Sequence, residues 1–130
     1  MSRDQPTADR RTLTPQELRI MKEVWRLGQA TVRHVHEALR TEREVAYTTV
    51  MTLMRVLETK GFLEKSLVDR AHVYRPVVAR EQAIGSMVRD FLDRVFDGAP
   101  QALLLHLAKD NRLTPAQRRA MKKLIEEVDE

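Results

Sequence analysis

The chain has 130 residues, of which 42% are hydrophobic and 32% are charged, a balance typical of an ordered globular protein rather than a disordered one. That length fits one domain, or one small domain plus an oligomerisation segment. The absence of cysteine excludes disulfides, zinc ribbons and thiolate chemistry. No apolar run approaches the roughly 20 residues that span a bilayer. We therefore expect a cytoplasmic protein that is neither exported nor embedded in a membrane.

The excess of positive charge lies in the first part of the chain. Residues 1–78 contain 14 Lys and Arg against 10 Asp and Glu, whereas residues 79–130 contain 9 of each kind. A polyanion partner would be attracted to the first part. A basic surface can also serve only solubility, so charge alone leaves both interpretations open.

The first predicted elements are a mobile arm and a capped helix. Residues 1–12 mix charged and small polar residues without an apolar period, so we expect a flexible arm. A helix start is then predicted by the run TPQE at residues 14–17, because Thr14 can cap the helix and Glu17 can complete a capping box. Gly28 is expected to end this helix in a left-handed conformation.

Two more helices and a hairpin are predicted next. Thr31 can cap a second helix, and residues 46–60 form a third that ends at Gly61. Residues 62–67 and 72–77 are typical of short strands around a turn at residues 68–71, with Pro76 at the edge or end of the hairpin. Three helices followed by a hairpin indicate a winged helix-turn-helix, and the alternative is another small α+β domain.

The expected fold is therefore mainly α with a small β wing, in which a winged helix-turn-helix domain at residues 13–78 precedes a three-helix dimerisation domain at residues 79–130. Residues 102–108 are apolar nearly all round and are expected to be buried, and the run TPAQ at residues 114–117 repeats the capping signature. So short a segment with so much apolar surface would be marginal alone, so we expect it to pair with a second subunit. The alternative is that these helices fold back on the winged domain of a monomer. The residues expected in the dimer interface are Ile84, Met87, Val88, Phe91, Val95, Leu103, Leu105, Met121, Leu124, Ile125 and Val128.

The third predicted helix has two chemically different sides. Helical spacing places Val50, Leu53, Met54 and Leu57 on a core side, and Thr48, Thr52, Arg55 and Thr59 on the opposite side, with Met51 beside them and Thr49 toward the flank. Threonine hydroxyls and an arginine can bond base edges, and threonine and methionine methyl groups can contact thymine methyls. A merely polar solvent face is the alternative.

The wing and the start of this helix add further candidates. Tyr47 can bond a phosphate with its phenol or pack against the domain, and Lys65 and Arg70 are placed as a wing needs them to reach phosphates or the minor groove. As ordinary surface charges, Lys65 and Arg70 would look the same. The complete set of predicted DNA-binding residues is Tyr47, Thr48, Thr49, Met51, Thr52, Arg55, Lys65 and Arg70.

Metal binding and catalysis are not expected. His34 and His36 are two residues apart on a helix and point away from each other, while His72 and His106 are isolated. Four scattered glycines offer no phosphate-cradling loop, and no nucleophile stands beside a base. We expect no metal, no cofactor and no enzyme activity.

Several runs of the sequence go beyond a generic winged helix. LTPQELRIMKEVW, TVRHVHEAL, AYTTVMTLMRVLETKGFLEK and DRAHVYRPV resemble the BlaI/MecI family of penicillinase repressors. The resemblance covers about residues 13–128, and its most specific part is TTVMTLMRVLETKG followed by the wing with Tyr74 in its second strand. The C-terminal part is similar more by its helix pattern and by LLLHL than by identity.

The resemblance implies a homodimeric repressor whose winged helices bind a palindromic operator, joined by three C-terminal helices. In family members that respond to β-lactam antibiotics, a membrane sensor-protease triggers cleavage in the dimerisation region, and the corresponding position here is His106 and Leu107. Two other interpretations stay open: a winged-helix regulator gated by a small molecule, and an interaction module that does not bind DNA.

Overall fold

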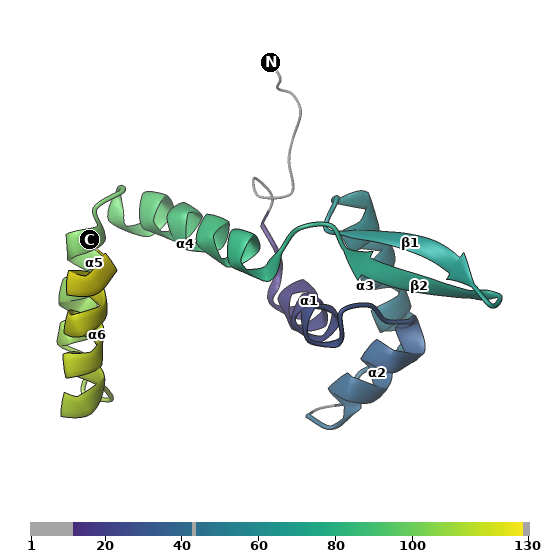
Figure 1. Ribbon diagram of the computed structural model, residues 1–130, viewed down its shortest axis with the longest axis horizontal. Helices are drawn as coiled ribbons and strands as arrows, with labels where there is room; N and C mark the ends of the chain where they lie inside the picture. Colours follow the sequence, from purple (N-terminus) through teal and green to yellow (C-terminus); the bar gives the residue numbers. More distant parts are fainter. Residues whose placement is uncertain (1–11, 43, 129–130) are drawn as a thin grey trace, which may run out of the picture. The chain divides into compact units, whose positions relative to one another are not determined.

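The computed structural model describes residues 12–42 and 44–128, so residues 1–11 of the predicted arm lie outside the described residues. Within them the chain forms six helices and one two-stranded antiparallel sheet (Figure 1). This confirms the predicted class, mainly α with a small β wing. In chain order the elements are α1 (Pro15–Leu27), α2 (Val32–Arg40), α3 (Tyr47–Thr59), β1 (Leu63–Val68), β2 (Ala71–Pro76), α4 (Arg80–Phe96), α5 (Pro100–Ala108) and α6 (Pro115–Val128).

The elements fall into two compact units, one ending at Met87 and the other beginning at Val88. The division lies inside α4, later in the chain than the predicted domain boundary after residue 78. The first unit holds α1, α2, α3 and the sheet, and the second holds α5, α6 and the end of α4. None of the described helices is long and apolar enough to span a bilayer.

The predicted start and end of α1 are confirmed in detail. The backbone N–H of Thr14 donates to Glu17 Oε1 at 2.9 Å, and the backbone N–H of Glu17 donates to Thr14 Oγ1 at 3.1 Å, which completes the capping box. Gly28 ends the helix with a φ of +87°, a value that side chains with a Cβ disfavour. A second capping box starts α2, where Thr31 is paired with His34 instead of an acidic residue or an amide.

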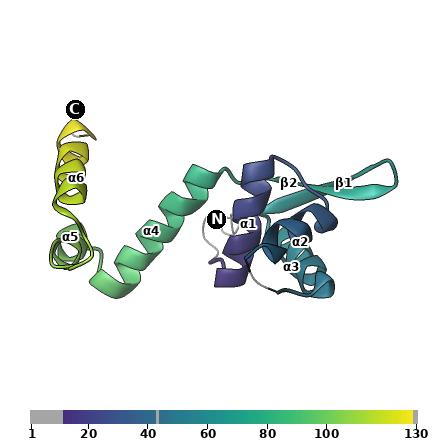
Figure 2. The same ribbon diagram turned by 90° about the horizontal axis from the view of Figure 1, so that it is seen from below.

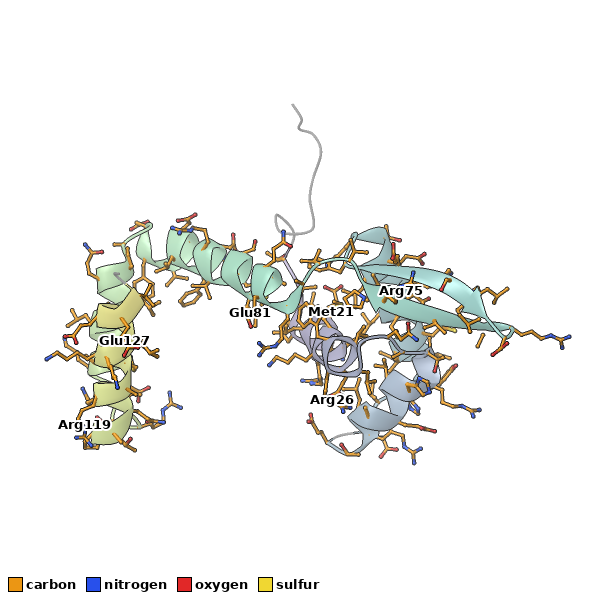
Figure 3. The ribbon with its side chains drawn as sticks, in the orientation of Figure 1. Met21, Arg26, Arg75, Glu81, Arg119 and Glu127 are labelled. Carbon is orange, nitrogen blue, oxygen red and sulfur yellow. The ribbon has the colours of Figure 1, made fainter. Side chains whose placement is uncertain are left out.

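The core of the first unit lies where the three helices meet the base of the wing. Figure 2 shows α1, α2 and α3 grouped together with the hairpin extending from them, and Met21 on α1 is labelled in Figure 3. The core side of α3 contributes fully buried side chains, as its helical spacing predicts. The buried set includes Ile20, Met21, Val24, Val35, Leu39, Val50, Met54, Leu57, Phe62 and Leu63, with Leu53 partly buried against it.

The wing is a hairpin closed by a two-residue turn. Strand register pairs Leu63 with Pro76 at one end and Val68 with Ala71 at the other. Pro76 therefore ends β2 as predicted, but the turn is Asp69 and Arg70 alone rather than residues 68–71. Both turn residues have positive φ, +51° and +69°, the pattern of a type I′ turn that matches the twist of paired strands.

One backbone bridge fixes the wing to the helices. Ala30, between α1 and α2, donates its N–H to the carbonyl of Tyr74 at 2.9 Å and accepts the N–H of Tyr74 at 2.8 Å. The indole N–H of Trp25 on α1 also donates to the carbonyl of Val78 just after the wing, at 2.9 Å. These hydrogen bonds attach the hairpin and the residues just after it to α1 and to the segment between α1 and α2.

The second unit is much less well packed than the first. The predicted cap of α6 is present. The backbone N–H of Thr114 donates to Gln117 Oε1 at 2.9 Å, and the backbone N–H of Gln117 donates to Thr114 Oγ1 at 3.0 Å. Leu92 is buried, but no residue of α5 is, and Leu105 is 55% exposed. None of residues 102–108 is buried in the single chain, because the short unit has no further layer to cover α5. Their expected burial against a second subunit stays a prediction.

A buried ion pair joins the start of α1 to the end of α3. Lys60 Nζ lies 2.8 Å from Oε1 of Glu17, whose side chain is almost fully buried, and Nζ also donates to the carbonyl of Thr12 at 3.2 Å. Burial raises the pKa of Glu17. Hydrogen bonds from Lys60 and Thr14, together with the Lys60 charge, outweigh that effect, so its pKa is lowered.

We predict that Lys60→Met destabilises the first unit by about 3 kcal/mol at pH 7, because it leaves a buried carboxylate without its cation. The lowered pKa of Glu17 stabilises the folded wild type at pH values above the unfolded pKa of about 4.3. This stabilisation is lost as the pH falls through the folded pKa. The stability gap between wild type and variant should therefore close on acidification. Urea unfolding followed by the fluorescence of Trp25, the only tryptophan, measures this unit at pH 7 and at about pH 3, below the unfolded pKa of Glu17.

The control for this experiment is Lys22→Met, which removes an exposed lysine from α1 and should leave the stability unchanged. A Lys60→Met protein as stable as the wild type at pH 7 would contradict the role assigned to the pair.

Candidate DNA-binding surface

The outward side of α3 carries the residues that helical spacing assigns to it. Thr48, Thr52, Arg55 and Thr59 are exposed, and Thr49 and Met51 are half-buried. The opposite side is anchored by Val50, Met54 and Leu57, none of which has exposed surface. Because those three positions recur at one-turn spacing, their burial fixes the rotation of α3 about its own axis.

A groove of about 550 Å³ lies between the start of α2, the outward part of α3 and the inner face of the wing. Four of the eight predicted DNA-binding residues line it, namely Tyr47, Met51, Arg55 and Lys65. Thr48, Thr49 and Thr52 of α3 and Arg70 at the hairpin turn are outside its lining. The groove is therefore one part of a wider surface to which the threonine side of α3 also belongs.

The groove has a basic character. Arg33, Arg55 and Lys65 line it, and no Asp or Glu is among the described residues of its lining. Lys65 has a weak contact with a carboxylate outside the lining, since its Nζ lies 3.7 Å from Glu58 Oε1 at the end of α3. Cations that line a concave surface favour a polyanion when the lining itself holds no carboxylate.

Tyr47 both packs against the domain and faces the groove, so the two sequence alternatives are compatible. Its ring meets the ring of His36 edge to face, with centroids 5.5 Å apart and planes at 79°. His36 is itself held by its Nε2, which donates to the carbonyl of Val45 at 2.9 Å. Tyr47 nevertheless keeps 46% of its surface exposed. The phenol is thus held in position at the edge of the groove.

Among the groove residues that sequence reasoning missed are an arginine and two histidines, Arg33, His34 and His72. His34 takes part in the α2 cap, where its Nδ1 accepts the N–H of Thr31 at 3.2 Å. His72 comes from β2, across the groove from α2. The Thr31 to His34 spacing was a usable signal for the start of α2, but the sequence does not reveal that this helix end faces the wing. No group of three metal-binding side chains occurs in the described part of the chain.

A comparison with known families decides the relationship. The sequence model of the family described as "Penicillinase repressor" matches residues 13–127, most of the chain. The chain belongs to the penicillinase repressor family. Members of this family are transcriptional repressors rather than enzymes.

Individual relatives agree with this assignment. The chain is 40% identical to the "Transcriptional regulator BlaI" of Mycobacterium tuberculosis over 95 residues, which cover 72% of this chain and 69% of the relative. It is 23% identical to the "Penicillinase repressor" of Bacillus licheniformis over 111 residues, which cover 85% of this chain and 87% of that protein.

Solved structures support the fold. The DNA-binding domain of the repressor BlaI matches with a TM-score of 0.50 and 24% identity, over 55% of this chain and 87% of that one. A structure of the hsRosR-S4 complex matches with a TM-score of 0.56 and 16% identity, over 95% of this chain and 96% of that one. The first unit of this chain therefore has a winged helix-turn-helix fold, as the sequence predicts.

Proposed function

We propose that the protein is a homodimeric transcriptional repressor that binds palindromic operator DNA through its winged helix. The observation that carries the proposal is the basic, carboxylate-free groove beside an outward α3 face rich in threonine. The similarity to the "Transcriptional regulator BlaI" of M. tuberculosis supports it. Bound at a promoter, such a dimer would exclude RNA polymerase.

In this proposal α3 lies in the major groove and reads base edges. Thr48 and Thr52 offer hydroxyls and methyl groups, and Arg55 offers a guanidinium that can bond two acceptors of one guanine. Arg55 is exposed, and no ion pair within the described residues occupies it. Its guanidinium is therefore free to bond DNA without first breaking a contact within the protein.

Two flanking elements would hold the phosphate backbones. Arg33 projects from the first turn of α2, where the backbone N–H groups of the helix start also favour an anion. Lys65 projects from β1 on the opposite side of the groove. Phosphate contacts of this kind fix the register of the protein on the duplex and carry no sequence information.

The second unit would supply the dimer contact. Seven of its predicted interface residues are exposed in the single chain, and Val128 is 81% exposed. An apolar surface of this extent on so small a unit is typical of an oligomer interface. The exposed seven are Val88, Phe91, Val95, Leu105, Leu124, Ile125 and Val128. Leu103 and Met121 of the same unit are half-buried, as are Ile84 and Met87, which belong to the first unit.

Charge is consistent with a second copy of the same chain as the occupant of this surface. Asp93 and Asp97 are exposed near the end of α4, whereas Arg119 and Lys122 are exposed on α6. Arg119 is labelled on α6 in Figure 3, as is Glu127. In a two-fold dimer a contact between residue i of one chain and residue j of the other occurs twice, so acidic α4 positions of each chain can face basic α6 positions of the other.

Release by a sensor-linked protease is the induction route that the family resemblance implies. His106 and Leu107 lie in the last turn of α5, where their carbonyls accept the N–H groups of Lys109 and Asp110 at 3.2 and 3.1 Å. The His106 ring also packs on Phe96, with centroids 5.5 Å apart. A protease that binds extended substrates would therefore require this turn to unwind before cleavage.

A nuclease-protection footprint around the protein's own gene, at two salt concentrations, tests the operator proposal. We expect a protected palindrome, which Arg55→Ala weakens by about 1–3 kcal/mol while removing the preference at one operator position. Thr52→Ala should weaken protection as well. Arg26→Ala, an exposed arginine of α1, serves as the control. Absence of protection even at low salt would favour an interaction module instead.

Arg33 is predicted to bind a phosphate, so its substitution should change DNA binding in a different way from the substitution of Arg55. Arg33→Ala should weaken binding to all sequences about equally and reduce the slope of log K against log salt by about 1. Fluorescence anisotropy over a salt series measures the slope. Arg40→Ala, at the other end of α2, is the matched control. An unchanged slope for Arg33→Ala would exclude the phosphate contact.

Sedimentation velocity at micromolar concentration tests the dimer. We expect a dimer for the wild type and a monomer for Leu124→Glu, because the variant buries an unpaired charge in the interface. Leu67→Glu changes a similarly exposed leucine of the first unit and should remain dimeric. A wild-type monomer would overturn the dimer and favour the fold-back alternative.

A further inference from the structure

The tip of the wing carries aliphatic side chains that the core does not use. Leu67 is 66% exposed and the adjacent Val68 is 48% exposed, whereas Leu63 at the other end of β1 is buried. Ala71, paired with Val68, is exposed as well. Successive residues of a strand point to opposite faces, so Leu67 lies on one face of the hairpin, while Val68 and Ala71 lie on the other. Single exposed aliphatic residues are common on protein surfaces, so what Leu67 could contact depends on its surroundings on that face.

Strand register places Leu67 on the groove side of the wing. Lys65 pairs with Tyr74 and Leu67 pairs with His72, and directly opposed residues share a face of a two-stranded sheet. Lys65, His72 and Tyr74 all line the groove. Leu67 lies on that same face, two residues farther toward the tip, which extends beyond α3 (Figure 1).

The turn contains a non-glycine residue in a disfavoured backbone conformation. Type I′ turns favour glycine or asparagine at the second central position, yet here it is Arg70 with a φ of +69°. Strained backbone positions of this kind are concentrated at functional sites. The consequence is a long cation at the tip, immediately beside the aliphatic pair. Lys65 and His72 lie on the same face of the hairpin as Leu67, so three groups that can bond phosphates lie near it, beside one exposed carboxylate, Asp69 of the turn.

We propose that Leu67 packs in the minor groove of A·T base pairs that flank the α3 site. The minor groove combines apolar sugar edges with phosphates on both rims, and leucine is among the side chains that minor-groove proteins insert there. The guanine N2 amino group is a donor in this groove, and an aliphatic side chain over it would leave it without an acceptor. Leu67 therefore selects against G·C pairs. This inference rests on the proposed operator binding.

The test uses the fragment protected in the footprint, with the flanking A·T pairs replaced by either inosine·C or G·C. The two replacements present the same major-groove edge and differ only by the minor-groove amino group. For the full-length wild type we expect the G·C fragment to bind about tenfold more weakly than the inosine·C fragment. For Leu67→Ala we expect the two fragments to bind within about twofold. Leu27→Ala, another exposed leucine, should behave as the wild type.

Wild-type binding to the unaltered fragment separates this inference from the operator proposal. If the wild type does not bind that fragment, the operator proposal fails and the minor-groove contact fails with it. If the wild type binds but shows no difference between inosine·C and G·C, the operator stands and the minor-groove contact is wrong. Discrimination that persists in Leu67→Ala would also overturn the assignment to Leu67. Thermal melts followed by circular dichroism check that both variants are folded.

Discussion

The burial of Val50, Met54 and Leu57 sets the rotation of α3, and the candidate binding surface depends on that setting. With those side chains in the core, Thr48, Thr52 and Arg55 must point outward. The backbone bridge between Ala30 and Tyr74 then places the wing beside α3, which completes the groove. The ion pair of Lys60 with Glu17 ties the end of α3 to the start of α1, so helix and groove are positioned by the same core.

The two units differ in how completely their apolar side chains are buried, and we propose a different role for each. The first unit buries a continuous core and presents a basic surface, on which the proposed DNA binding by each subunit depends. The second leaves large aliphatic side chains exposed, among them Leu124 and Val128, and in the proposed dimer a second copy of the chain would cover them. In the proposed dimer, affinity and operator symmetry come from joining two winged-helix units. Each winged-helix unit recognises the bases of its own half-site.

Local signals made much of the first unit predictable. The Thr14 to Glu17 capping box and the two sides of α3 follow from spacing alone, because they depend on residues within one or two turns. The approach of Arg33 to the wing depends on how α2 packs against distant elements, and no local pattern encodes that. For residues 102–108 the apolar pattern predicts burial but does not say whether the same chain supplies it, and in the single chain α5 stays uncovered.

Selection of bound fragments from random-sequence duplex DNA by the full-length protein would test the central claim most directly. Sequencing of the bound pool should reveal an inverted repeat, with half-sites separated by one or more helical turns of roughly 10 bp each. That result requires both a sequence-reading α3 and a symmetric dimer. A bound pool with no enriched sequence would contradict base recognition by α3. A single unrepeated half-site would contradict the dimer.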